Sequence, residues 1–152
     1  MGQDMGQLSE WNENESLPWE ILDYDLHKQM KIYVQALNRL YQTYPALYQL
    51  DTHPDGFEWI NCTSGQDNMV VFLRKTEKLE ETLLVVCNFA PVVHEKFQMG
   101  VPFHGKYKEI FNSDDENFGG WGVTNPRVKT SKKEEWDERA ESIAVSYTHL
   151  TL

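Results

Sequence analysis

The sequence predicts a mainly β protein in which one amphipathic helix precedes an antiparallel β-sandwich. Two observations carry this prediction. Between residues 25 and 44, apolar side chains recur every three or four positions, which is the period of a helix. After residue 45 the apolar period falls to two, and turn residues separate the short runs, which is typical of antiparallel strands.

The helix is expected from Asp25, as its N-cap, to Tyr44. Pro45 ends it, because proline has no N–H and disfavours helical geometry in the preceding residue. A stripe this apolar must pack against another element. It consists of Leu26, Met30, Tyr33, Val34, Leu37, Leu40, Tyr41 and Tyr44.

Short strands are predicted after this helix, at 57–60, 69–73, 82–89, 92–99, 107–111 and 136–145. The run 82–89 is the most apolar, so we expect it to be the most buried strand. Trp59 and Trp136 lie in strand patterns and are expected in the core. Residues from Asn112 to about Lys133 are rich in turn formers and predict a long loop.

Composition limits the partners of the chain. Its 152 residues suffice for a single core, and 40% are hydrophobic. The formal net charge of −10 argues against binding to nucleic acid or to an anionic membrane, since both are polyanions. No run approaches the about 18 to 20 apolar residues that span a bilayer, and no secretory leader pattern opens the chain. A cytoplasmic location is therefore expected, and neutral ligands remain possible partners.

The cysteines and histidines predict neither a metal site nor a cofactor. Cys62 and Cys87 form no CxxC pair. The five histidines lack the i, i+4 spacing of a helical metal pair. Cys87 lies within an apolar run, so we expect a small buried side chain there.

The first nineteen residues combine glycines, amides, carboxylates and two tryptophans, a mixture typical of binding loops. Sugars stack on tryptophan and form hydrogen bonds with amides and carboxylates. This stretch therefore indicates a loop that contacts carbohydrate.

Further motifs follow this stretch in a fixed order: Leu17-Pro18-Trp19, Leu37-Asn38-Arg39-Leu40-Tyr41, Asp55-Gly56-Phe57-Glu58-Trp59-Ile60, Leu84-Val85-Val86-Cys87-Asn88-Phe89-Ala90-Pro91, Gly100-Val101-Pro102, and Asn112-Ser113-Asp114 with Gly119-Gly120. Together they resemble the C-terminal part of bacterial 1,4-α-glucan branching enzymes over about residues 1–145. Asp4 and Met5 depart from the Glu and Phe expected there, which puts the fine contacts of the first loop in doubt.

This resemblance implies a domain organisation. Residues 1–45 would be the last loop and helix of a truncated TIM (β/α)8 barrel, and 46–145 a sandwich of the α-amylase C-terminal all-β type. Residues 146–152 stand where the family has a Leu-Pro-Pro-Leu end, and we expect them to be a non-native tail.

The resemblance also implies a reaction. Such an enzyme is a retaining transglycosylase that cuts an α-1,4 glucan and transfers it to a 6-hydroxyl, forming the α-1,6 branches of glycogen. Three carboxylates carry this chemistry, and in the family all lie upstream of the last barrel helix. No catalytic residue is therefore assigned here, and the chain alone is predicted to be inactive. Its expected partners are α-glucan or glycogen and the remainder of its own barrel.

Two candidate binding regions follow. In the first loop Gln3, Asp4, Gln7, Glu10 and Trp11 are predicted to edge the catalytic cleft, because the loop after the eighth strand opens on the catalytic face. The alternative is that these residues only brace neighbouring loops.

The second region is 112–122, where Phe118 and Trp121 could form an aromatic platform for glucan. The alternative is ordinary turn chemistry, with the aromatic rings folded back on the sandwich.

A second function class also stays open. A free-standing, non-catalytic glucan-binding or interaction module would share the sandwich but not the barrel. The reading frame upstream of Met1 distinguishes the two classes, because only the branching enzyme continues there with barrel strands and three carboxylates.

Overall fold

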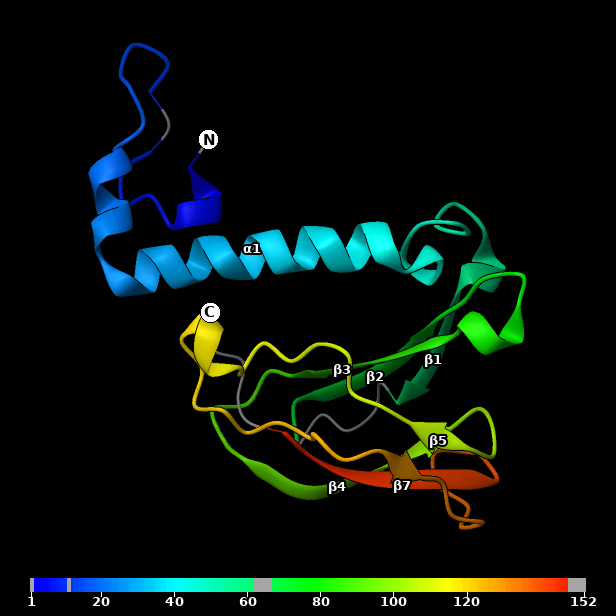
Figure 1. Ribbon diagram of the computed structural model, residues 1–152. Helices are drawn as coiled ribbons and strands as arrows, with labels where there is room; N and C mark the ends of the chain where they lie inside the picture. Colours follow the sequence, from blue (N-terminus) through cyan, green and yellow to red (C-terminus); the bar gives the residue numbers. More distant parts are fainter. Residues whose placement is uncertain (1, 11, 62–66, 148–152) are drawn as a thin grey trace.

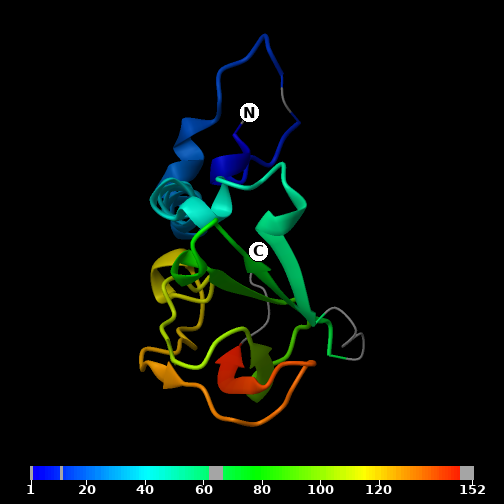
Figure 2. The same ribbon diagram turned by 90° about the vertical axis from the view of Figure 1, so that its right-hand side faces the viewer.

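The computed structural model describes residues 2–10, 12–61 and 67–147. An opening segment with two short 3-10 helices leads into a long α-helix, and strands follow (Figure 1). The helix α1 lies between the opening segment on one side and the strands on the other (Figure 1). A view turned by 90° shows the same order of layers (Figure 2). The bounds of the helical elements are η1 Gln3–Met5, η2 Trp19–Asp23, α1 Asp25–Thr43, η3 Pro45–Leu47, η4 Pro54–Gly56, η5 Leu79–Glu81 and η6 Glu116–Phe118.

Helix α1 confirms the predicted helix within one residue at its C-terminus. It ends at Thr43, and Pro45 opens the next 3-10 turn. The predicted N-cap is wrong: Tyr24 occupies the cap position, and Asp25 is the first helical residue. A carboxylate in the first turn is favourable there because it faces the positive end of the helix dipole.

The strands form antiparallel pairs in two main layers. The first layer is a three-stranded sheet in the order β1-β2-β3, and the second contains the pair β4-β7 with the small pair β5-β6 beside it. The strand bounds are β1 Phe57–Asn61, β2 Met69–Arg74, β3 Leu83–Asn88, β4 His94–Val101, β5 Lys106–Tyr107, β6 Lys129–Thr130 and β7 Glu141–Tyr147. The predicted antiparallel sandwich is confirmed.

Two predicted strands are wrong in extent. The strand expected at 107–111 has two residues, Lys106–Tyr107, and the chain leaves the sheet after them. In place of a strand from residue 136, Trp136 and Arg139 close a two-residue turn, and β7 begins at Glu141. Asp137 and Glu138 both have positive φ there, which ends an extended run. Strand β7 continues to Tyr147, so it includes the first two residues of 146–152, while 148–152 lie outside the described residues.

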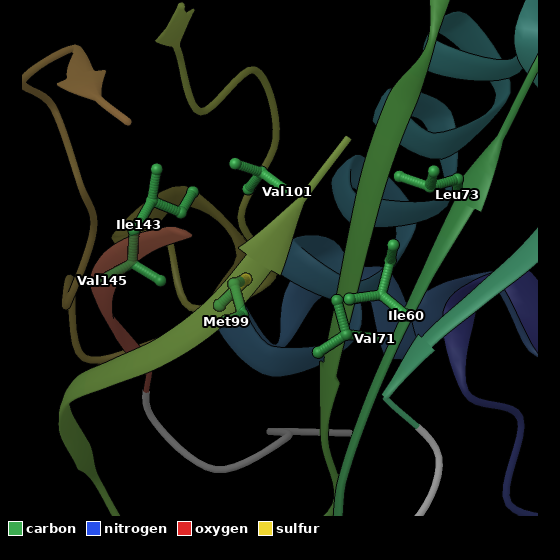
Figure 3. Packing of buried hydrophobic residues seen from close by; sticks show 7 residues of the cluster. All are labelled: Ile60, Val71, Leu73, Met99, Val101, Ile143 and Val145. Atoms are coloured by element: carbon green, nitrogen blue, oxygen red, sulfur yellow. The ribbon is translucent and has the colours of Figure 1, made fainter. Parts of the chain in front are cut away.

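The core lies between the two layers. Side chains from β1 and β2 face side chains from β4 and β7, all of them buried (Figure 3). They are Ile60, Val71, Leu73, Met99, Val101, Ile143 and Val145. The predicted burial order is wrong, because the middle strand β2 is the most buried, with Val71 fully enclosed. The more apolar β3 is an edge strand, and its side chains up to Cys87 are half-buried.

The two tryptophans expected in the core are exposed. Trp59 precedes the core residue Ile60 and therefore points to the opposite face of β1, where it is 50% exposed. It packs edge-to-face on Phe57 and Phe72. Trp136 is 44% exposed at the corner of the tight turn.

The turn 136–139 ties the two layers together. The carboxylate of Asp137 accepts hydrogen bonds from Asn61 Nδ2 of β1 at 2.7 Å and from the backbone N–H of Gly100 in β4 at 2.9 Å. Arg139 forms an ion pair with Glu58 of β1. Glycine is required at position 100, because the backbone oxygen of Trp136 occupies the space that a Cβ would need.

Candidate functional site

The opening segment, residues 2–10 and 12–19, lies beside the N-terminal half of α1 with its 3-10 helices, and the chain between them loops away from α1 (Figure 1). The 3-10 helix η1 lies between Gly2 and Gly6, and both glycines have left-handed φ, 80° and 69°. That conformation strains any residue with a Cβ, so the two glycines fix where the segment bends. The segment is a folded loop and not a frayed end.

Two contacts hold η1 on α1. Met5 is 1% exposed, so its side chain is a buried anchor. His27 of α1 donates from Nδ1 to the backbone oxygen of Met5 at 2.7 Å. The side chains around Met5 therefore have fixed positions relative to the helix.

The structure describes four of the five predicted contact residues of the first loop, Gln3, Asp4, Gln7 and Glu10. Gln3, Asp4 and Glu10 are exposed, so their polar groups are accessible. Gln7 serves the loop itself: its Nε2 donates to Ser9 Oγ at 3.1 Å and more weakly to the backbone oxygen of Glu10. Trp11 lies outside the described residues. A contact with glucan stays a prediction for all five residues.

The opening segment and the first turn of α1 carry four large apolar side chains that are exposed. We call these residues the apolar flank: Leu8, Trp19, Tyr24 and Leu26. Leu8 is 86% exposed and Leu26 73%, values far above those of ordinary core-facing side chains. Trp19 carries Lys31 5.3 Å from its ring centroid. Leu26 belongs to the predicted helical stripe and was expected to be covered, whereas the structure leaves its side chain exposed.

The second candidate region, 112–122, is organised by a buried carboxylate. Asp114 is 2% exposed, and its two oxygens accept from the backbone N–H groups of Trp121, at 3.0 Å, and Val123, at 2.9 Å. Asn112 accepts from the N–H of Asp114 and donates to the oxygen of Val123. These bonds close the loop on itself, which is the turn chemistry that its composition indicated.

The two aromatic residues of this loop have different surroundings. Phe118 packs between Tyr33 of α1 and Phe111, with ring centroids 5.4 and 5.5 Å away. Burial raises the pKa of the Tyr33 phenol, with the Cys87 thiol as a smaller cause. Trp121 is 71% exposed on the outside of the loop. Phe118 therefore joins the loop to α1, whereas most of the Trp121 side chain is exposed.

A Ser–His–Glu cluster lies at the other end of the sandwich. Ser131 Oγ donates to Glu141 Oε2 at 2.7 Å, and His104 Nδ1 lies 3.1 Å from the same carboxylate oxygen. These two contacts lower the pKa of Glu141. A catalytic triad needs its nucleophile and its acid on opposite nitrogens of the imidazole, whereas Ser131 and Glu141 both approach Nδ1. The cluster therefore fastens β7 to the chain around His104 and cannot act as a triad.

The described residues meet neither the requirements of a metal site nor those of a membrane-spanning helix. Within residues 2–10, 12–61 and 67–147, no three His, Cys, Asp or Glu side chains come together as metal ligands. In the same residues, no helix has the length and apolarity to cross a bilayer. The opening segment carries exposed amide and carboxylate side chains, those of Gln3, Asp4 and Glu10.

Comparison with known families decides the identity of the β layers. Residues 59–151 match the family described as alpha amylase, C-terminal all-beta domain. The chain belongs to this family. The match begins within β1 and covers every later strand of the all-beta domain, while the opening segment and α1 lie before it.

Longer relatives match the chain beyond the all-beta domain. A 1,4-alpha-glucan branching enzyme GlgB of Oceanobacillus iheyensis is 41% identical over 152 residues, which is 100% of this chain and 24% of that protein. The enzymes of the same name from Geobacillus stearothermophilus and Synechococcus elongatus are 42% and 43% identical over 84% and 82% of this chain, and 20% and 16% of their own lengths. The chain thus spans a quarter or less of these relatives.

Proposed function

We propose that this chain is the C-terminal part of a 1,4-α-glucan branching enzyme, which forms α-1,6 branches in glycogen by transglycosylation. The observation that carries the proposal is the extent of the match. The Oceanobacillus iheyensis branching enzyme aligns with all 152 residues, including the opening segment and α1, which lie before the all-beta domain. A module that shared only the sandwich would have no reason to match there.

The apolar flank supports the same proposal. Leu8, Trp19, Tyr24 and Leu26 are large apolar side chains that stay exposed, and such exposure favours a contact with another chain or domain. The relatives are at least four times longer than this chain, so they contain further polypeptide that could cover it. We propose that the remainder of a catalytic barrel packs on this flank, with residues 1–45 as its end and 46–145 as the sandwich.

In this proposal the opening segment forms one edge of the catalytic cleft. Exposed Gln3, Asp4 and Glu10, together with Gln7 and Trp11, would contact bound glucan through hydrogen bonds and ring stacking. The three catalytic carboxylates would belong to the remainder of the barrel. The residues of this chain would therefore bind and orient the glucan without taking part in the transfer reaction. Phe118 and Trp121 are a proposed secondary contact for long glucan chains, and Trp121 has the more accessible ring.

A chimera tests the proposal. The matching segment of the Oceanobacillus iheyensis enzyme is replaced by this chain, and branching is measured on amylose by the loss of iodine absorbance and by debranching of the product. We expect an active chimera, and no activity from the 152-residue chain alone. A monodisperse chimera without activity, beside an active parent enzyme, would contradict the proposal.

The opening segment is tested in the same chimera. Replacing Glu10 or Trp11 by Ala should lower kcat/KM on amylose about fivefold, since one net contact contributes roughly 1 kcal/mol. Glu13→Ala is the matched control, because Glu13 is an exposed glutamate of the same segment outside the proposed contact set. If all three variants had the same kcat/KM, Glu10 and Trp11 would only stabilise the loop and would not contact glucan.

The second candidate function, a free-standing glucan-binding or interaction module, gives the opposite result. The chain alone would then be retarded in a glycogen-containing native gel, and the chimera would be inactive. A cytoplasmic location, and the absence of nucleic-acid and membrane partners, stay predictions that rest on the sequence, above all on its net charge of −10.

A further inference from the structure

Helix α1 contacts the opening segment at η1 through the side chain of His27. The imidazole donates from Nδ1 to the backbone oxygen of Met5 at 2.7 Å. Within the described residues, the other hydrogen bonds of residues 2–10 join that stretch to itself. The position of η1 on α1 therefore depends on this hydrogen bond together with the packing of the buried Met5 side chain.

The imidazole of His27 also borders the bend that follows η1. Gly6 has a left-handed φ of 69°, and a Cβ at this position would lie 3.4 Å from Nδ1 of His27. The backbone of Gly6 therefore lies close against the ring. Because the carbonyl oxygen of Met5 can only accept, Nδ1 of His27 must carry the proton of the bond.

The residues directly before Met5 are two of those proposed to contact glucan. Gln3 and Asp4 form η1 together with Met5, and both of their side chains are exposed. Backbone hydrogen bonds close this 3-10 helix, from Met5 to Gly2 and from Gly6 to Gln3, at 3.2 Å each. The three residues of η1 are therefore joined as one unit, so whatever holds Met5 also determines where Gln3 and Asp4 lie.

We propose that His27 is a positioning residue for glucan binding, which holds η1 so that Gln3 and Asp4 face the bound glucan. The His27 side chain is half-buried and its Nδ1 is engaged with Met5, so it acts through η1 and not by touching the glucan. This inference rests on the proposed function, because it assigns a role in the same cleft. It adds a residue of α1 to a set that lay entirely within the opening segment.

The expected kinetic effect follows from this indirect role. Without the His27 bond, η1 has to be ordered when glucan binds, and this ordering weakens binding. Contacts that are equally strong in the ground state and in the transition state affect KM and leave kcat unchanged. A purely structural role would have the opposite effect, because a smaller folded fraction lowers the apparent kcat and leaves KM unchanged.

Kinetics of the active chimera on amylose test the proposal. His27→Ala should raise KM about fivefold, as expected for one net hydrogen bond, and change kcat by less than about twofold. In His27→Asn, Nδ2 stands as many bonds from Cβ as Nδ1 does in histidine and can donate to the same oxygen, so KM should return to within about twofold of the parent value. Lys28→Ala is the matched control, because Lys28 is an exposed neighbour on α1 and should leave KM unchanged.

A double-mutant cycle tests whether His27 acts through η1. In a Gln3→Ala, Asp4→Ala background, His27→Ala should raise KM further by less than about twofold, because the side chains that it positions are gone. An inactive chimera beside an active parent enzyme would contradict the proposed function and this inference together. An active chimera would overturn this inference alone if His27→Ala left KM unchanged, if His27→Asn did not restore it, or if the full effect persisted in the double-variant background.

Discussion

Glycine at position 138 should stabilise the protein, because Glu138 adopts a backbone conformation that suits glycine. Its φ is 59° in the two-residue turn between Trp136 and Arg139. A residue with a Cβ costs roughly 1 to 2 kcal/mol in that left-handed region, and glycine loses about 0.5 to 1 kcal/mol more backbone entropy on folding. The difference predicts that Glu138→Gly raises the free energy of unfolding by about 0.5 to 1 kcal/mol.

The neighbouring residue provides the matched control. Asp137 also has positive φ, 49°, but its carboxylate accepts hydrogen bonds from Asn61 and from the backbone of Gly100. Asp137→Gly relieves the same kind of backbone strain and removes both bonds, each of which contributes a net of roughly 0.5 to 1.5 kcal/mol. We therefore expect Asp137→Gly to destabilise the protein by about 1 to 2 kcal/mol.

Urea unfolding followed by tryptophan fluorescence measures both variants. For an m-value of about 2 kcal/mol/M, Glu138→Gly should move the midpoint upward by about 0.4 M, and Asp137→Gly should move it downward. The reasoning would be refuted if Glu138→Gly were neutral or destabilising at unchanged m, or if both variants shifted the midpoint in the same direction.

Three further predictions concern the remaining contacts. Phe118→Ala should lower the free energy of unfolding, measured in urea, by about 2 kcal/mol, because its half-buried ring packs on the rings of Tyr33 and Phe111. Trp121 is exposed, so Trp121→Ala should change the same free energy by less than about 0.5 kcal/mol. Gly100→Ala should destabilise by more than about 1 kcal/mol in thermal melts, because the new Cβ meets a backbone oxygen. The pKa of Glu58 lies below its ordinary value, chiefly because Lys75 donates a hydrogen bond to its carboxylate. The ionised Glu58 carboxylate therefore contributes to the free energy of unfolding above a pH of about 4.3, and this contribution is lost as the pH falls through the folded-state pKa. Below a pH of about 4.3, the parent protein should lose stability more steeply than Glu58→Gln in urea unfolding.

The sequence indicated the elements whose signal is local. The spacing of Leu37, Leu40 and Tyr44 and the position of Pro45 predicted α1 almost to its last residue, because helical period and proline geometry need no distant partner. The antiparallel strands were also predicted from a local signal, because apolar and polar residues alternate within short runs that turn residues separate. The departures concern burial and pairing, which depend on residues far along the chain.

Trp59 and the strand 82–89 show why those parts could not be predicted. Because side chains alternate along a strand, Trp59 and Ile60 must point to opposite faces of β1. The sequence does not indicate which of these faces packs against the second layer. The apolar content of 82–89 predicted the most buried strand, whereas the pairing of the strands makes β2 the middle strand and β3 an edge strand. In the candidate site, the glycines and polar residues of the opening stretch predicted a binding loop. The anchoring of Met5 by His27 joins residues 22 positions apart and has no local signal.

The pairing of β4 with β7 has a consequence for the order of folding. The first sheet can form from consecutive hairpins, but β4 must wait until a strand 40 positions later is available. The bonds of the closing turn span still greater separations, 76 residues between Asn61 and Asp137 and 81 between Glu58 and Arg139. Closing such long loops is entropically costly, so the layers join after each has formed its local contacts. During synthesis β4 therefore passes through a period as an unpaired strand edge, and the time that β7 needs to reach it determines how long the nascent protein is exposed to aggregation.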